Sequence, residues 1–307
     1  MRRIVRRLAA ALSILVAAMV TLVPAAAGTP ELPEVPGAND LSCRPTPDKP
    51  NPVVLVHGSA TDAVNSWSTL APALRKQGYC VFAANLGRAA VLTTSASATP
   101  NAAWPGLGPI GAALSGRTLY GVADIATSAA ELAGFVTTVR AATGAERVAL
   151  VGHSTGGTII RAFLKAHPAE ADTVVTLGTP YRGSDFAELP AKYPDLASLG
   201  MDGPHIAAQV FGNAGVQQTM GSAVLMQLNW PVETVPGVRF TAIASHDDEV
   251  ITPPDTALLA VPVGADRNVW VQDGCAAHTV DHGHLLVDPH TMALVAAALA
   301  GTPLPTC

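Results

Sequence analysis

Residues 147–168, RVALVGHSTGGTIIRAFLKAHP, decide the fold that this sequence predicts. Residues 148–151 are a continuous apolar run, which is typical of a parallel strand buried on both faces of a sheet. Residues 158–166 favour a helix, and Pro168 ends it because a proline cannot continue a helix from within. The stretch therefore predicts a buried strand, a tight turn and a helix in direct succession.

The turn carries Gly152-His153-Ser154-Thr155-Gly156, which fits the pattern G-x-S-x-G. In a nucleophile elbow of this pattern, the serine occupies a strained turn between strand and helix, and the glycines allow neighbouring backbone to come close. The positive N-terminal end of the helix would face the serine hydroxyl and stabilise a tetrahedral oxyanion. Ser154 is therefore the predicted nucleophile. The competing interpretation is a chance match in a chain with 27 glycines, so the remaining sequence must decide.

The first 27 residues have the pattern of a secretory signal peptide. Four arginines precede an apolar run at 8–23, and three alanines at 25–27 follow it, so we expect cleavage after Ala27 and an exported protein. A membrane anchor is the alternative, but Pro24 interrupts the run, and no later stretch reaches the roughly 18 apolar residues that a membrane span needs. The mature protein is therefore expected to have no stable membrane anchor.

Charge and cysteine content argue against several kinds of partner and site. Removing the signal peptide takes away four arginines and no acidic residue, so the formal net charge changes from −5 to −9 (−5 − 4). This balance argues against nucleic acid and anionic membranes as partners, and a monomer is expected. The sequence has no C-x-x-C motif or His/Cys cluster, so it predicts neither a metal site nor a cofactor. Four cysteines in an exported chain predict two disulfides, with three possible pairings.

An alternation of strands and helices places the elbow in one α/β domain. The predicted strands are residues 52–56, 79–84, 148–151, 173–177, 239–244 and 268–271, and the predicted helices are residues 67–77, 122–142, 158–166 and 290–300. This order predicts a mostly parallel sheet with helices on both faces. Residues 28–51 lack a hydrophobic period and predict an extended N-terminal arm before the catalytic domain, which spans 52–307. Two long segments interrupt the domain: a loop at 85–119, expected beside the site, and a cap-like insertion at 184–236, which has apolar patches but no regular pattern.

A serine hydroxyl needs a histidine base, and that histidine needs a carboxylate to hold its tautomer. In the α/β-hydrolase arrangement the chain order is serine, acid, histidine, with the acid after a late strand and the base after the last one. This order leaves four acids, Asp247, Asp248, Glu249 and Asp255, and four histidines, His278, His282, His284 and His290. His57 and His153 adjoin the site but are expected to be structural, and His290 is expected to cap a helix.

Several motifs are spread over residues 39–307. They are NDLSC (39–43), PNPVVLVHG (50–58), GYCVF (78–82), GLGPI (106–110), GHSTGG (152–157) and DEVITP (248–253). With these motifs the chain resembles the secreted α/β-hydrolase lipases and esterases of actinobacteria, within the wider group of bacterial triacylglycerol lipases. The resemblance implies the α/β-hydrolase fold and the hydrolysis of carboxylic esters.

The resemblance also implies roles for individual residues. It implies a triad of Ser154 as nucleophile, Asp248 as acid and His282 as base, and two disulfides, Cys43–Cys80 and Cys275–Cys307. His284 remains the rival base because it lies on the same loop as His282, and Asp247 remains the rival acid.

The oxyanion hole is expected to consist of the backbone N–H groups of Ser59 and Thr155, so that the identity of their side chains matters little. The chain departs from the family pattern after Gly58, where Ser-Ala-Thr-Asp replaces a Gly-containing or aromatic run, and in the long segment at 86–104. These departures leave the acyl-chain preference open.

The prediction is an exported serine hydrolase that cleaves carboxylic esters through an acyl-enzyme, with lipid or acylglycerol esters as the expected substrates. A polyester hydrolase or an acyltransferase on the same triad is the alternative among enzymes, separated by whether the acyl group passes to water or to an added alcohol. An inert secreted binding protein with the same fold is the alternative outside enzymes, since a fold alone does not fix a function.

Overall fold

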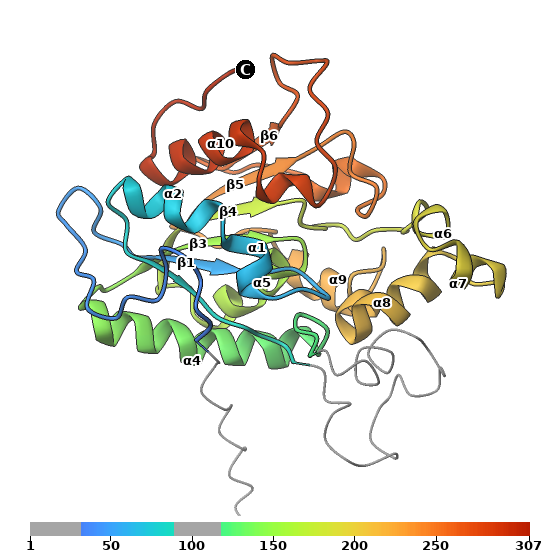
Figure 1. Cartoon of the computed structure of the whole chain (residues 1–307), viewed down its shortest axis with the longest axis horizontal. Helices are drawn as coiled ribbons and strands as arrows, with labels where there is room; N and C mark the ends of the chain where they lie inside the picture. Colours follow the sequence, from blue (N-terminus) through green and yellow to red (C-terminus); the bar gives the residue numbers. More distant parts are fainter. Residues whose placement is uncertain (1–31, 89–117) are drawn as a thin grey trace, which may run out of the picture.

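The computed structural model describes residues 32–88 and 118–307. The predicted signal peptide at 1–27 lies outside these ranges, as do the start of the predicted arm, residues 89–117 of the long loop expected beside the site, and the GLGPI motif within that loop. Figure 1 shows the described chain as a central sheet with helices above and below it.

Six strands form one sheet. They are β1 (Val53–Val56), β2 (Val81–Ala83), β3 (Val148–His153), β4 (Ala171–Leu177), β5 (Arg239–Ala244) and β6 (Arg267–Trp270). Their order is β2-β1-β3-β4-β5-β6, and every neighbouring pair is parallel. This confirms the predicted parallel sheet. The carboxyl ends of all six strands point to the same edge, which is where sites form in open α/β sheets.

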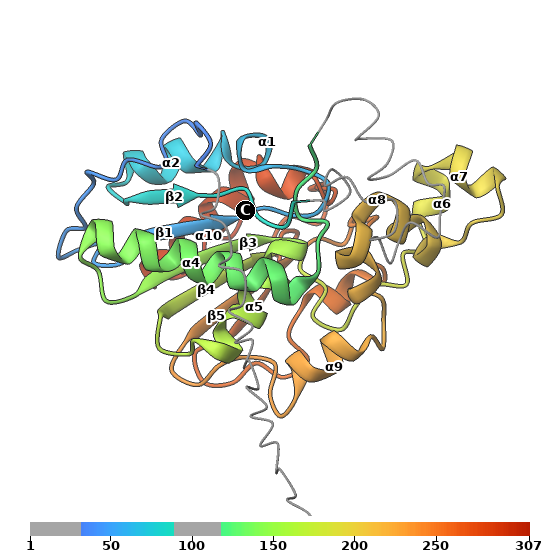
Figure 2. The ribbon, with the colours of Figure 1, turned by 90° about the horizontal axis from the view of Figure 1, so that it is seen from below.

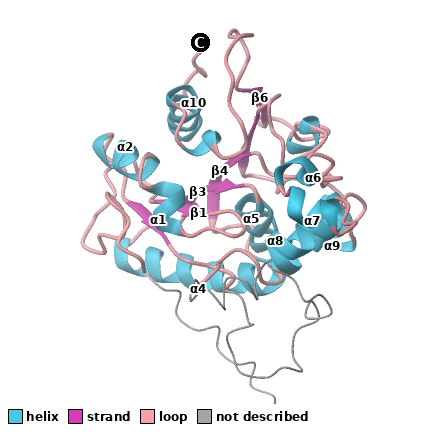
Figure 3. Cartoon of the chain, turned by 45° about the vertical axis from the view of Figure 1, so that its right-hand side comes forward, coloured by secondary structure: helices cyan, strands magenta, loops and turns pink. Residues whose placement is uncertain are grey.

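Helices cover both faces of the sheet, as Figure 3 shows. They are α1 (Ala63–Trp67), α2 (Leu70–Lys76), α4 (Ile125–Thr143), α5 (Thr155–Ala166) and α10 (Pro289–Ala300). Helices α4 and α5 pack on one face, and α1, α2 and α10 pack on the other. Among the described residues, none of the helices combines the length and apolar character required to cross a membrane.

Strand β1 shows why the sheet needs both layers. Val54 and Val56 point to the core shared with α4 and α5, whereas Val53 and Leu55 point to the core shared with α1, α2 and α10. All four side chains are fully buried. Because burial of each such side chain stabilises the fold by about 1.5 to 3 kcal/mol, a continuous apolar strand favours a sheet with helices on both faces.

Of the helix predicted at 67–77, residues 70–76 form α2, whereas Trp67 is the last residue of a separate helix, α1. Asp62 caps α1 by accepting a hydrogen bond from the backbone N–H of Asn65. Pro72 explains the break, because it lacks an N–H group and is tolerated only near the start of a helix, the position that it occupies in α2.

The insertion at 184–236 contains helices that the sequence analysis did not predict. They are α6 (Leu189–Lys192), α7 (Pro194–Ser198), α8 (Gly203–Gln217) and α9 (Ala223–Asn229). Figures 1 and 2 both place α6, α7 and α8 beyond one end of the sheet. Three are short, and α8 is kinked at Gly212 (φ 64°), so no long apolar stripe marks them. Asp202 and Ser222, which cap α8 and α9, were the available signals.

Two short 3₁₀ helices lie in the loops that carry the predicted acid and base. They are η2 (Pro254–Ala257) and η3 (His284–Leu286).

The described part of the N-terminal arm lies along the outer edge of β2. The Asn39 side chain accepts a hydrogen bond from the N–H of Ala83 and donates one to the Ala83 carbonyl, both at 2.8 Å. The Cα atoms of Cys43 and Cys80 are 5.7 Å apart, and those of Cys275 and Cys307 are 5.5 Å apart. Both pairs are thus bonded as the resemblance implies, and the first ties the arm to the start of β2.

Replacing both Cys43 and Cys80 by alanine should lower the free energy of unfolding by about 3 to 4 kcal/mol, because the cross-link closes a loop and restricts the unfolded chain. The two cysteines are 37 residues apart. Denaturant unfolding of the double variant against the parent measures the difference, and peptide mapping without reductant checks the pairing. A Cys43–Cys275 peptide, or equal stability of the two proteins, contradicts this prediction.

Candidate active site

Ser154 lies between the end of β3 and the start of α5, with φ 52° and ψ −124°. A positive φ is costly for a residue with a side chain and persists only where surrounding structure enforces it. The Ser154 N–H donates to the Leu177 carbonyl (2.8 Å), and the Thr179 hydroxyl donates to the Ser154 carbonyl (2.9 Å). The strand-turn-helix unit expected of a nucleophile elbow is therefore present, and the end of β4 holds it.

The two glycines of the G-x-S-x-G motif allow this turn to pack closely. A Cβ atom on Gly156 would come within 2.1 Å of the Val56 carbonyl oxygen, and one on Gly152 within 2.6 Å of the Gly157 nitrogen. No side chain can occupy either space without moving the backbone. This close approach brings Ser154 to the carboxyl edge of β1 and β3.

Asp248 and His282 form a buried pair after β5 and β6. The Nδ1 atom of His282 lies 2.8 Å from Oδ2 of Asp248. The other carboxylate oxygen of Asp248 accepts hydrogen bonds from the backbone N–H groups of Val250 and Ile251, at 2.9 and 2.8 Å. With Nδ1–H donating to the carboxylate, Nε2 of His282 is left without a proton and can act as a base.

A cavity of about 260 Å³ is lined by both Ser154, the predicted nucleophile, and His282, the predicted base. The insertion supplies part of its wall, with the aromatic rings of Phe186, Tyr193 and Phe211. The structure therefore places the three predicted triad residues at one site, next to the insertion.

The sequence profile of the family described as alpha/beta hydrolase fold matches residues 51–250. The chain belongs to this family. The matched segment includes the elbow and the Asp248 loop, whereas His282 lies after it.

Two relatives of this α/β-hydrolase are named triacylglycerol lipase, one from Pseudarthrobacter phenanthrenivorans and one from Burkholderia plantarii. Each is 32% identical to this chain over 168 residues, which are 52% of this chain. Those residues are 43% and 38% of the two relatives, so each match covers less than half of the relative's own length.

Solved structures with a similar fold include two lipases. The lipase B of Aspergillus fumigatus aligns with a TM-score of 0.56 at 20% identity, over 81% of this chain and 52% of that one. The mature form of a Bacillus licheniformis lipase aligns with a TM-score of 0.54 at 19% identity, over 83% of this chain and 94% of that one. At these identities the likeness concerns the fold, and it confirms the predicted α/β-hydrolase architecture.

The rival histidines of this α/β-hydrolase lie elsewhere. His284 is paired with Asp281 (2.8 Å), and 68% of its side chain is exposed. His278 contacts Asp288 (2.9 Å), which caps α10. The expectation that His290 caps this helix is wrong, because the carboxylate of Asp288 accepts the hydrogen bond from the helix start.

Each rival carboxylate has another partner. Asp247 accepts hydrogen bonds from the Val280 N–H and from the Gln272 amide, both at 3.0 Å. Asp255 pairs with Arg182 (2.8 Å). These contacts keep both carboxylates in structural roles.

Glu249 supports the base without contacting its ring. Its carboxylate accepts a hydrogen bond from the backbone N–H of His282 (3.1 Å) and pairs with Lys192 of α6. Burial acts to raise the pKa of Glu249, but the hydrogen bonds from Lys192 and from His282 lower it below its usual value. The ion pair thus links the insertion to the loop of Asp248, and the hydrogen bond from the His282 N–H to Glu249 extends that link to His282.

His57 and His153 have structural contacts, as expected. The ring of His57 donates from Nδ1 to the Gly58 carbonyl (2.8 Å) and accepts at Nε2 from the Leu86 N–H (3.0 Å). Nε2 of His153 contacts the carbonyl oxygen of His282 (3.0 Å). Burial, and then the nearby His282, lower the pKa of His153 to about 3, so this ring is neutral at neutral pH.

Two further residues of the site, Gly178 and Thr179, were not predicted from the sequence. Gly178 (φ 54°) lies beside the acid–base pair, where a Cβ atom would come within 3.0 Å of Oδ2 of Asp248 and 3.1 Å of Nδ1 of His282. Thr179 donates a hydrogen bond to the Ser154 carbonyl, although nothing in the sequence singled it out. Their position directly after a parallel strand was the available signal.

The side chains at the expected oxyanion hole take part in specific contacts. The hydroxyl oxygens of Ser59 and Thr155 are 2.6 Å apart. Within 32–88 and 118–307, no group of three or more His, Cys, Asp or Glu residues is arranged to hold a metal ion.

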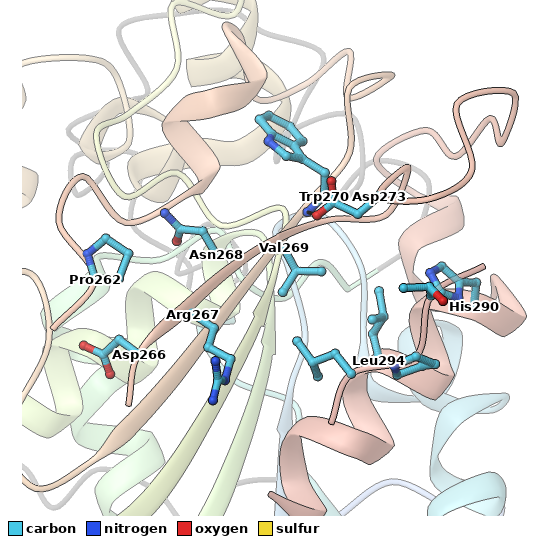
Figure 4. A pocket seen from close by; sticks show the side chains of 12 residues that line it. Pro262, Asp266, Arg267, Asn268, Val269, Trp270, Asp273, His290 and Leu294 are labelled. Atoms are coloured by element: carbon cyan, nitrogen blue, oxygen red, sulfur yellow. Dashed lines mark hydrogen bonds between the residues drawn. The ribbon is translucent and has the colours of Figure 1, made fainter. Parts of the chain in front are cut away.

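A second cavity, of about 390 Å³, lies between β6 and α10 and is drawn in Figure 4. Arg267 and Trp270 of β6 line it, together with Leu294 of α10 and residues 304–306. None of the three predicted triad residues lines it, so it lies apart from the candidate active site.

Proposed function

We propose that this chain is a carboxylic ester hydrolase in which Ser154 forms an acyl-enzyme, and that its substrates are lipid or acylglycerol esters. The observation that carries the proposal is the hydrogen bond between His282 and Asp248 at the wall of the cavity that Ser154 also lines. The relatives named triacylglycerol lipase support the same class of reaction.

The first half of the proposed reaction, acylation, uses all three triad residues. The Ser154 oxygen attacks the ester carbonyl carbon while its proton passes to Nε2 of His282, and Asp248 stabilises the imidazolium that forms. The carbonyl oxygen becomes an oxyanion, and the backbone N–H groups of Ser59 and Thr155 are the donors assigned to it. When the tetrahedral intermediate collapses, the bond to the alkoxy group breaks, and His282 donates its proton to the departing alcohol.

Deacylation repeats these steps with water as the nucleophile. His282 takes a proton from water, the resulting hydroxide adds to the acyl carbon, and the same oxyanion donors stabilise the second tetrahedral intermediate. His282 then returns a proton to the Ser154 oxygen as the carboxylic acid leaves. Every proton transfer uses one ring nitrogen, because Asp248 keeps the other nitrogen oriented.

The walls of the cavity support an apolar acyl group. Phe186 and Phe211 from the insertion face it together with Ile251 and Leu286 from the loops of the acid and the base. Apolar side chains of this kind bind an acyl chain by removing its surface from water. This lining favours esters with an apolar acyl chain over esters with a polar acyl group.

A panel of p-nitrophenyl esters, from acetate to palmitate, tests the proposed function. We expect turnover of several members by the parent protein and none above background by Ser154→Ala. Added alcohol separates the enzymatic alternatives, because an acyltransferase forms a new ester while a hydrolase releases the acid. A parent protein that hydrolyses no ester and does not react with a fluorophosphonate probe contradicts the proposal and supports an inert binding protein.

A further inference from the structure

Hydrogen bonds next to Ser154 join the insertion to both expected oxyanion donors. The Thr158 hydroxyl donates to the Gln218 side-chain oxygen (3.0 Å), and the Gln218 amide donates to the Thr155 hydroxyl (2.7 Å). The Thr155 and Ser59 hydroxyl oxygens are 2.6 Å apart, and the Ser59 hydroxyl donates to the Gly121 carbonyl (2.7 Å). Thr155, Thr158 and Gln218 are all buried, so water does not readily compete for these bonds.

The direction of each hydrogen bond follows from counting protons. A carbonyl oxygen only accepts, so the single hydroxyl proton of Ser59 goes to Gly121. Ser59 can then only accept from Thr155, and Thr155 donates its own proton there while accepting from Gln218. The carbonyl of Ala214, which lies 3.1 Å from the Gln218 nitrogen, fixes which end of the amide faces Thr155. Only one set of hydrogen-bond directions therefore satisfies all the donors and acceptors in this series of hydrogen bonds.

This series of hydrogen bonds connects segments that are distant in sequence. Ser59 follows β1, Thr155 begins α5, and the two are 96 residues apart. Gln218 comes directly after α8 of the insertion, and its carbonyl accepts a hydrogen bond from the Ser184 N–H (2.9 Å) at the insertion's first residue. The Thr155–Ser59 contact therefore joins the two residues of the expected oxyanion hole, and Gln218 anchors that contact to the insertion.

We propose that Gln218 is a positioning residue that, through the Thr155 hydroxyl, holds the backbone N–H groups of Thr155 and Ser59 in place for the oxyanion. The inference rests on the proposed ester hydrolysis. Oxyanion donors act only when they are already aimed at the point where charge develops, and side-chain contacts around them provide that order. The role is indirect, since Gln218 is assigned no contact with the reacting atoms.

Thr155→Val keeps the shape of the side chain and removes the hydroxyl, and Gln218→Leu removes the amide. Each should lower kcat for a short ester by about tenfold with KM changed less than about threefold, a smaller loss than the roughly 10²- to 10³-fold that follows removal of an oxyanion donor itself. Thr155→Ser restores the hydroxyl and should recover most of the activity that Thr155→Val loses. Thr219→Val, whose hydroxyl donates only to the Val216 carbonyl in the same turn, is the matched control and should stay at the parent rate.

The double variant separates positioning from independent damage. If both residues act through the same series of hydrogen bonds, Thr155→Val combined with Gln218→Leu should lower kcat no more than the larger single change does. Additive losses, failure of Thr155→Ser to restore kcat, or an effect confined to KM each overturn the proposal. If Gln218→Leu does not fold, as thermal unfolding would show, Gln218→Met, which keeps the length of the side chain and removes the amide, takes its place in the same comparison.

The activity of the parent protein separates a failure of this inference from a failure of the proposed function. A parent that turns over no ester contradicts the proposed function, and the positioning role with it. A parent that is active, with Thr155→Val and Gln218→Leu at the same kcat, contradicts the positioning role alone and leaves ester hydrolysis supported.

Discussion

Ser154→Ala and His282→Ala should each lower kcat for a short p-nitrophenyl ester by about 10⁶, because the members of a triad act as a unit and either loss removes the activated nucleophile. His282 is the expected base because its Nδ1 is bound to a buried carboxylate and its ring lines the cavity that Ser154 also lines. Steady-state rates of purified variants, with circular dichroism to verify folding, measure the effect.

His284→Ala is the matched control for the base. His284 lies two residues beyond the expected base, and its ring is mostly exposed and pairs with Asp281. Removing it should therefore leave the fold and most of the activity. A His282→Ala variant within tenfold of the parent, beside a folded but inactive His284→Ala variant, shows that the assignment of the base is wrong.

Asp248→Asn should lower kcat by about 10⁴ without unfolding the protein, since an amide next to Nδ1 favours the wrong imidazole tautomer and does not stabilise the imidazolium. The carboxylate is buried and accepts two backbone hydrogen bonds, so an amide oxygen can keep those contacts while the amide NH₂ faces His282. The same ester assay measures the loss.

Asp247→Asn tests whether the neighbouring carboxylate can be the acid. Asp247 binds the Val280 N–H and the Gln272 amide rather than a histidine, so the variant should retain most of the activity. If a folded Asp247→Asn variant is inactive while Asp248→Asn is active, then Asp247 is the acid and the assignment of Asp248 is wrong.

The insertion has a larger part in this site than a cover alone requires. It supplies aromatic side chains to the cavity, and it contacts segments that carry predicted site residues. Lys192 pairs with Glu249, which holds the backbone of His282, and Gln218 donates to the hydroxyl of Thr155. A displacement of the insertion would therefore change the contacts of both the expected base and the expected oxyanion donors.

The sequence by itself determined the unit of strand, elbow and helix around Ser154. The apolar run, the two glycines and the proline act on neighbouring residues, so their effects are local and can be deduced from order alone. The same reasoning located the six strands, since buried parallel strands are short apolar runs wherever they lie in the chain. Export remains a prediction, which rests only on the residue pattern of positions 1–27.

Only the tertiary structure showed which side chains meet. Chain order left four acids and four histidines, and the resemblance chose among them, but the contact of Asp248 with His282 joins residues 34 positions apart. The contacts of Thr179 with Ser154 and of Gln218 with Thr155 join residues 25 and 63 positions apart. No periodicity or cap encodes such a contact, because it exists only after the parallel strands bring their carboxyl ends to one edge and the insertion packs against that edge.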